Sequence, residues 1–182
     1  MNITVYCGAN KGNSERIREA AEELGRWIAD NGHTMVYGGG SIGLMEVIAD
    51  TVLRRGGEVI GVIPEFLMKH EKGHTGLHTL EIVPDVSTRK NRMMELGDAF
   101  IAMPGGTGTL EEITEAISLK RLRLLQKPIV FYNIDGYYDM MKPVFAKMVE
   151  YDFYPAEDLE LVRYASDVRE LENILEEETW AI

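Results

Sequence analysis

The chain has 182 residues, of which 45% are hydrophobic and 27% are charged, a composition that is typical of a globular protein and excludes a disordered chain. Nineteen Lys and Arg residues against 30 Asp and Glu residues give a net charge of −11, which disfavours nucleic-acid binding because such a chain repels a polyphosphate backbone. No apolar run approaches the roughly 18 residues of a membrane span, and Met1–Tyr6 has no basic segment of a signal peptide. The single cysteine, Cys7, excludes an intramolecular disulfide and a zinc site built from cysteines. We therefore expect a cytoplasmic protein without membrane or nucleic-acid partners.

Short apolar runs alternate with longer segments of helical period along the chain. Ser14 is a predicted N-cap and Gly32 a predicted C-cap of the first helix. In chain order the predicted elements are strand Ile3–Cys7, helix Ser14–Asn31, strand Thr34–Tyr37, helix Ile42–Arg55, strand Glu58–Ile63, strand Leu80–Val83, helix Thr88–Gly97, strand Asp98–Met103, helix Thr109–Leu125, strand Pro128–Tyr132, helix Tyr137–Tyr151, strand Leu161–Tyr164 and helix Asp167–Glu178. Residues 65–76 show no clear period, and we expect a loop or short helical turns there, with His70 and His74 as loop histidines near a substrate entrance.

The strands are near-continuous apolar runs, which is the pattern of a parallel sheet buried on both faces by helices. Strand–helix alternation over the whole chain predicts an α/β fold, a three-layer Rossmann-like doubly wound parallel sheet that forms a single domain over residues 1–182. In such a sheet, ligands bind beyond the carboxyl ends of the strands.

Glycine-rich turns follow three of the predicted strands: Gly8 after the first, Gly38–Gly43 after the second and Pro104–Gly108 after the fifth. Glycine lets a backbone approach a ligand closely, and the N-terminus of the following helix favours an anion there. One such turn is as well explained by a tight connection, but three at one sheet edge favour a nucleotide site. Gly38, Gly40 and Gly43 fit the dinucleotide pattern Gly-x-Gly-x-x-Gly, yet the acid expected about twenty residues later is absent, which disfavours a dehydrogenase.

The fifth-strand turn, Pro104-Gly105-Gly106-Thr107-Gly108-Thr109-Leu110-Glu111-Glu112, is the most specific motif of the chain. It resembles the Pro-Gly-Gly-x-Gly-Thr-x-x-Glu signature of the LONELY GUY family, the cytokinin riboside 5′-monophosphate phosphoribohydrolases. The similarity extends to Gly38-Gly39-Gly40 with Gly43-Leu44-Met45, to Gly61-Val62-Ile63-Pro64, to Arg89-Lys90, and to Lys127-Pro128 with Asp135-Gly136-Tyr137-Tyr138. Two positions depart from the family pattern: Glu46 replaces a common glycine, and Ser87 replaces the histidine of plant members.

The resemblance implies a catalytic pair formed by Arg89 and Glu112. It also implies substrate or phosphate contacts at Glu71, Lys90, Gly105, Gly106, Thr107, Gly108, Thr109, Leu110, Glu111 and Ser118, with Gly39 and Gly40 in the second glycine turn. The residues alone leave other interpretations open. Glu112 would then be an acid that stabilises the first turn of a helix, and Glu111 competes with it for either role. Arg89 would be a charge on the surface of a helix. The histidine spacing does not form a stable metal face, so neither a metal nor a cofactor is expected.

These observations together predict a hydrolase of the N-glycosidic bond of a nucleoside 5′-monophosphate, a cytokinin riboside 5′-monophosphate or AMP, that releases free base and ribose 5-phosphate. The alternative is a non-catalytic nucleotide or molybdenum-cofactor carrier of the same fold. Apolar residues around more than one face of the helix predicted at Thr109–Leu125 predict a homodimer through that helix, with Arg121 and Arg123 either reaching the neighbouring chain or remaining solvated.

Overall fold

The predicted strands pair side by side in one parallel sheet. In the computed structural model, which describes residues 1–179, seven strands lie in the order β4-β3-β2-β1-β5-β6-β7 and every neighbouring pair is parallel. Residues 180–182 of the predicted domain lie outside the described residues. The strands are β1 (Asn2–Tyr6), β2 (Thr34–Tyr37), β3 (Glu58–Pro64), β4 (Thr79–Val83), β5 (Ala99–Ala102), β6 (Ile129–Tyr132) and β7 (Arg163–Ala165). The predicted doubly wound α/β class is confirmed.

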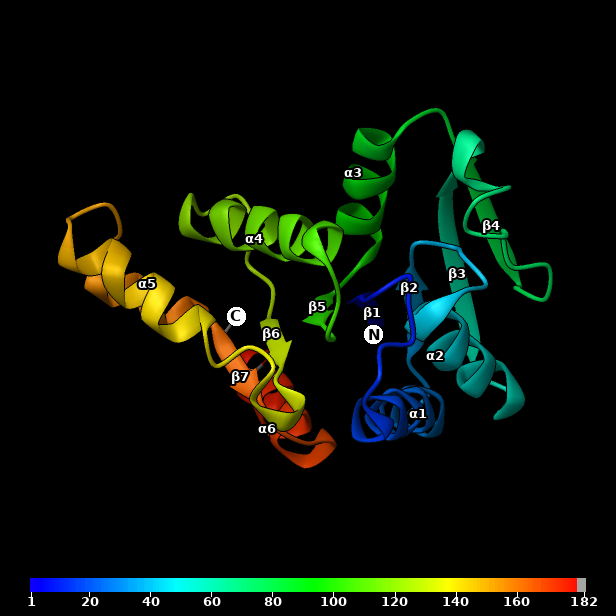
Figure 1. The fold of residues 1–182 in the computed structure, drawn as a ribbon, viewed down its shortest axis with the longest axis horizontal. Helices are drawn as coiled ribbons and strands as arrows, with labels where there is room; N and C mark the ends of the chain where they lie inside the picture. Colours follow the sequence, from blue (N-terminus) through cyan, green and yellow to red (C-terminus); the bar gives the residue numbers. More distant parts are fainter. Residues whose placement is uncertain (180–182) are drawn as a thin grey trace.

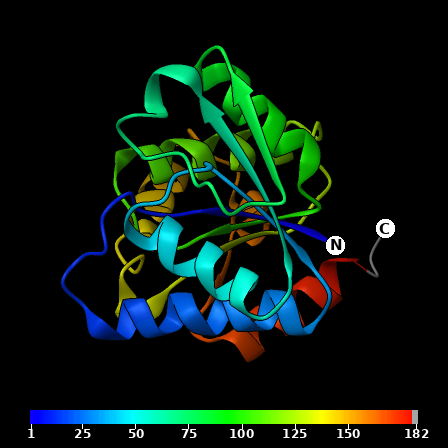
Figure 2. The same ribbon diagram turned by 90° about the vertical axis from the view of Figure 1, so that its right-hand side faces the viewer.

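Helices cover both faces of this sheet (Figure 1). One face carries α1 (Glu15–Asp30), α2 (Gly43–Arg54) and α6 (Val168–Thr179), and the other carries α3 (Val86–Leu96), α4 (Thr107–Arg121) and α5 (Met141–Glu150). Short 3₁₀ turns connect the rest: η1 (Glu65–Leu67), η2 (Ile134–Gly136) and η3 (Ala156–Leu161). Figure 2 shows α1 and α2 side by side beneath the sheet. None of these described helices is long and apolar enough to cross a membrane.

The alternation of side chains along each strand divides the core into two layers. On β1, Ile3 and Val5 face α1, α2 and α6, whereas Tyr6 faces α3, α4 and α5. Both layers consist mainly of apolar side chains, and strands β5 and β6 are buried along their whole length, which explains why their sequences show continuous rather than alternating hydrophobicity.

Local signals placed the first helix correctly. The Ser14 hydroxyl accepts a hydrogen bond from the Ile17 amide at 3.3 Å, and Gly32 follows the C-cap with a left-handed φ of 66°. The end of α4 and the start of α5 differ most from the prediction. Helix α4 begins at Thr107 and ends at Arg121, not at Leu125, because the chain turns at Arg123, whose φ is 60°.

Helix α5 also starts later than predicted. The segment after β6 turns through Asp135 and Gly136, both with left-handed φ, and the Asn133 side chain accepts a hydrogen bond from the Tyr138 amide at 2.6 Å. The helix therefore begins at Met141. This boundary places Pro143 in the first turn, where its missing N–H has no intrahelical acceptor to lose.

The order of the strands fixes where a ligand can bind. The chain runs from β1 outward to the edge strand β4, and α3 then brings it back to β5 on the other side of β1. The connections that leave β1 and β5 therefore diverge to opposite faces of the sheet. This divergence opens a crevice at the carboxyl ends of these two strands.

Candidate functional site

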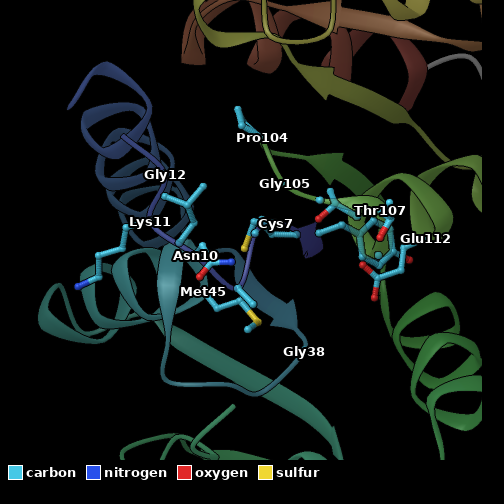
Figure 3. A pocket seen from close by; sticks show the side chains of 18 of the residues that line it. Cys7, Asn10, Lys11, Gly12, Gly38, Met45, Pro104, Gly105, Thr107 and Glu112 are labelled. Atoms are coloured by element: carbon cyan, nitrogen blue, oxygen red, sulfur yellow. The ribbon is translucent and has the colours of Figure 1, made fainter. Parts of the chain in front are cut away.

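A cavity of about 470 Å³ occupies this crevice, and its size is ordinary for a small-molecule site. Its walls come from the turns after β1, β2 and β5, from the starts of α2 and α4, and from α3. In Figure 3, Thr107 and Glu112 lie on the α4 side, Cys7 lies between the two sides, and Asn10, Lys11 and Gly12 form the opposite side. The turns after β1, β2 and β5, which are far apart in sequence, thus meet around one cavity.

The turn between β5 and α4 is built for close backbone packing. The Gly8 amide donates a hydrogen bond to Pro104 O at 3.1 Å, and the Tyr137 hydroxyl donates one to Gly105 O at 2.6 Å. A Cβ at Gly105 would lie 2.1 Å from Thr109 Oγ1, so only glycine fits there. Thr109 is accordingly buried against this turn, whereas Thr107 is exposed toward the cavity.

The N-terminus of α4 faces the cavity without a side-chain cap. Its N-cap residue is Gly106, and within the described chain no side chain accepts a hydrogen bond from the first-turn amides. Free amides and the positive end of the helix dipole together form a site for an anion such as phosphate.

Arg89 lies between two carboxylates at the inner wall of the cavity. Its Nη1 lies 3.4 Å from Glu71 Oε2, and its Nη2 lies 3.9 Å from Glu112 Oε1. All three side chains are mostly buried, with 13%, 17% and 12% of the side chains of Arg89, Glu71 and Glu112 exposed. Arg89 Nε is buried and has no hydrogen-bond partner among residues 1–179, which leaves one donor for a ligand.

Burial changes the acidity of this group of residues. It raises the pKa of Glu112 to about 7; Arg89 opposes the rise, and the Glu111 and Glu71 carboxylates reinforce it. Burial also raises the pKa of Glu71, again against the effect of Arg89. Near neutral pH, Glu112 therefore exists in both its protonated and its ionised form, which is the property that a proton-transferring side chain requires.

Lys90 is directed away from the cavity, although it adjoins Arg89 in sequence. Its Nζ lies 2.6 Å from Glu111 Oε1 and 2.9 Å from Glu115 Oε2, so it joins α3 to α4. These hydrogen bonds raise the pKa of Lys90. Glu111 is 58% exposed, whereas Glu112 is buried beside Arg89, and this distinguishes two glutamates that the sequence left as competitors.

The structure brings together most, but not all, of the residues that the sequence singled out. Those that line the cavity are Glu71, Arg89, Gly105, Gly106, Thr107, Gly108, Thr109 and Glu112. Those outside the lining are Gly39, Gly40, Lys90, Leu110, Glu111 and Ser118. Ser118 is exposed on α4 and donates a hydrogen bond to Thr114 O at 2.8 Å. Gly39 and Gly40 instead pack closely against β3 and against Glu71.

Sequence reasoning missed several lining residues. The turn after β1 contributes Ala9, Asn10 and Lys11, and α2 contributes Leu44 and Met45. The residues of the β1 turn could have been predicted from the fold class, because a doubly wound sheet places the end of its first strand at the ligand-binding crevice.

The two departures from the family pattern occupy different environments. Glu46 pairs with Lys11, whose Nζ lies 3.0 Å from Glu46 Oε2, and so links α2 to the turn after β1. Ser87 is exposed near the start of α3.

The loop histidines differ from the expectation. His74 is 8% exposed and its Nε2 lies 2.9 Å from Asp50 Oδ1, so it is a buried, paired side chain and does not line the cavity. Within the described part of the chain, no group of three or more His, Cys, Asp or Glu side chains is placed to hold a metal ion.

Comparisons with known proteins identify the family of this chain. A family model described as "Possible lysine decarboxylase" matches residues 45–175. The chain is 41% identical over 177 residues to the probable cytokinin riboside 5′-monophosphate phosphoribohydrolase LOGL1 of Oryza sativa subsp. japonica, a match that covers 97% of this chain and 79% of the rice protein. It is 39% identical over 175 residues to the cytokinin riboside 5′-monophosphate phosphoribohydrolase LOG1 of Arabidopsis thaliana, with coverage of 96% and 82%.

Among solved structures, the molybdenum cofactor binding protein from the phototrophic bacterium Rippkaea orientalis superposes with a TM-score of 0.75 at 22% identity, and the match covers 97% of this chain and 95% of that one. A likeness at this level of identity shows the shared fold alone. The sequence relatives are much closer and span nearly the whole chain. The chain therefore belongs to the family of the cytokinin riboside 5′-monophosphate phosphoribohydrolases, the LOG family.

Proposed function

We propose that this protein hydrolyses the N-glycosidic bond of a nucleoside 5′-monophosphate, with a cytokinin riboside 5′-monophosphate or AMP as substrate. The observation that carries the proposal is the buried Glu112 beside Arg89, directly after a helix N-terminus that is open to an anion. The named activity of relatives at about 40% identity supports the same reaction.

The site suggests how the substrate is held. The free amides at the start of α4 bind the 5′-phosphate, and the exposed Thr107 hydroxyl adds a donor. Glu112 lies on the first turns of the same helix, so phosphate binding fixes the distance between the ribose and the carboxylate. Arg89, with its unpaired Nε, holds ribose or phosphate oxygens.

The reaction follows from the charges at this wall. As the bond between C1′ and the base nitrogen breaks, its electron pair leaves with the base, and positive charge develops at C1′. The ionised Glu112 stabilises this charge and takes a proton from the water whose oxygen attacks C1′. The leaving base takes a proton from solvent, Glu112 returns its own proton to solvent, and the products are free base and ribose 5-phosphate. A pKa of about 7 suits Glu112 for accepting a proton at neutral pH.

A carrier protein of the same fold is the competing function. It is favoured by the fold likeness to molybdenum-cofactor binding and carrier proteins, which share only 22–23% identity with this chain. A carrier has no use for a buried carboxylate of raised pKa at the ligand, and such a group destabilises the fold. The environment of Glu112 therefore favours the hydrolase.

The test is incubation of the purified protein with AMP and, separately, with isopentenyladenosine monophosphate, followed by chromatographic detection of free base. We expect base release from at least one nucleotide, and the ratio of the two kcat/KM values gives the base preference. Binding of both nucleotides without base release would refute the hydrolase and support the carrier.

We further propose that the protein acts as a homodimer in the cytoplasm, without nucleic-acid partners. Large apolar side chains are exposed after α4 and from the N-cap of α5 onward: Leu122, Leu124, Met140, Val144, Tyr151 and Phe153. Phe153 is 78% exposed, and a surface of this kind favours a closed two-fold contact. Arg121 has partners within its own chain, Asp158 at 3.1 Å and the ring of Tyr154.

A further inference from the structure

The loop that carries Glu71, residues 68–78, lies between η1 and β4 and is tied to the turn between β2 and α2. The Ser41 amide donates hydrogen bonds to Glu71 O and Lys72 O, both at 2.9 Å, and Gly40 forms an isolated bridge with Gly73. Lys72 adopts a left-handed φ of 48°, a conformation that costs a lysine about 1 kcal/mol. The loop therefore depends on contacts outside itself to keep this shape.

His74 supplies these contacts three residues after Glu71. Its backbone amide donates to Gly39 O at 2.9 Å, and its Nδ1 accepts a hydrogen bond from the Gly76 amide at 3.1 Å. With Nδ1 acting as acceptor, the ring proton lies on Nε2, which donates to Asp50 Oδ1 at 2.9 Å. One buried side chain thus joins the loop, its own backbone and helix α2.

We propose that His74 and Asp50 are positioning residues, which hold the Glu71 loop so that the Glu71 carboxylate stays against Arg89 in the site. The Glu71–Arg89 distance of 3.4 Å is set from the loop side by backbone contacts alone, because Glu71 has no other ion pair in the described structure. If the loop moves, Arg89 loses one of its two carboxylates and turns toward Glu112.

The phosphate cradle does not depend on this loop. It is formed by the turn between β5 and α4, which is held by Gly8 and Tyr137. Loss of the His74–Asp50 contact should therefore lower kcat more than it raises KM, because it misplaces Arg89 while the free amides at the start of α4 still bind the phosphate. For its activity readout, this inference rests on the proposed hydrolase function.

The experiment compares Asp50→Ala with a matched control, Asp30→Ala. Both aspartates lie on the surface, with 42% and 47% of their side chains exposed, and each accepts a hydrogen bond from a cationic or imidazole side chain. Asp30 pairs with Arg55 and does not contact the loop. In Asp50→Ala we expect the Ser41 and His74 amides to exchange hydrogen roughly tenfold faster, and kcat for AMP to fall about tenfold with KM within about threefold. Asp30→Ala should change none of these values.

Two further variants separate positioning from general damage. Asp50→Asn keeps an acceptor for His74 Nε2–H and should restore kcat to within about twofold of the wild type. In a Glu71→Gln background, Asp50→Ala should add no further loss, because its effect passes through Glu71.

The inference is overturned if Asp50→Ala behaves like Asp30→Ala, or if its loss of kcat is undiminished in the Glu71→Gln background. If the wild type releases no base from either nucleotide, the proposed function fails. The exchange rates of Ser41 and His74 then still decide whether His74 holds the loop.

Discussion

Replacement of Glu112 by glutamine should stabilise the protein at alkaline pH while abolishing its activity. The pKa of Glu112 rises from its ordinary value of 4.5 to about 7 in the folded chain, chiefly through burial. At about 1.4 kcal/mol per pKa unit, this rise corresponds to about 3 kcal/mol. Between pH 4.5 and 7 the folded protein keeps a proton that the unfolded chain has lost, so the free energy of unfolding falls as pH rises through this window and levels off above it.

Glutamine cannot ionise, so the free energy of unfolding of the variant does not fall in this pH window. The two proteins should have nearly equal stability near pH 4.5, and the variant should become more stable toward pH 8. Glu112 lies beyond the first turn of α4, where the helix dipole adds little, so the expected advantage of the variant at pH 8 stays at about 3 kcal/mol. The same substitution should lower the rate of base release roughly 100-fold or more.

The assay is urea unfolding, followed by circular dichroism at half-unit steps from pH 5 to pH 8, for the wild type and Glu112→Gln. Glu111→Gln is the matched control, because Glu111 is the neighbouring residue but is 58% exposed, and its stability difference should stay small and vary little with pH. Parallel curves for the wild type and Glu112→Gln would refute the reasoning, as would near-wild-type turnover of the variant.

Three other predictions follow from the site and the surface. Adenosine, which lacks the 5′-phosphate, should be turned over with a kcat at least about tenfold below that of AMP at saturation, and equal values would mean that the turn before α4 does not bind phosphate. Gly105→Ala should lower the free energy of unfolding by roughly 1–3 kcal/mol, measured by urea unfolding, because its Cβ would meet Thr109; Gly108→Ala, where a Cβ meets nothing within 4 Å, should not be destabilised. Phe153→Glu should convert a dimer to monomers in sedimentation analysis, whereas a wild type that is already monomeric would contradict the proposed interface.

The sheet could be predicted well from the sequence because its signals are local. Each strand is a short apolar run, and Ser14 and Gly32 mark the ends of the first helix through side-chain and backbone chemistry that involves only neighbouring residues. The ends of α4 and α5 escaped prediction because non-glycine residues, Arg123 and Asp135, take left-handed conformations there. The residue type of Arg123 does not mark such a turn, whereas the dipeptide Asp135-Gly136 and Pro143 are usable signals for the later start of α5.

The site could be predicted only in part, because some of its residues are positioned by local motifs and others by contacts between distant elements. The glycine turns and the signature predict that Glu112 and the turn before α4 lie at one sheet edge, and the structure brings Arg89 and Glu71 to the same cavity. The direction of Lys90 depends on how α3 packs against α4, which adjacency to Arg89 in sequence does not reveal. The burial of His74 likewise depends on Asp50, 24 residues earlier on another element.

The central position of β1 has a consequence for how the protein is made. Ile3 pairs with Met35 on one side and with Ala99 on the other, so one edge of β1 stays open until the chain has been synthesised past β5. During translation the first half can assemble β1 to β4, but it presents a bare strand edge that invites pairing with other chains. Arg89 and Glu71 already belong to that half, whereas Glu112 arrives with α4. The emerging chain therefore covers the open edge of β1 with β5 just before α4 adds Glu112 to Arg89 and Glu71.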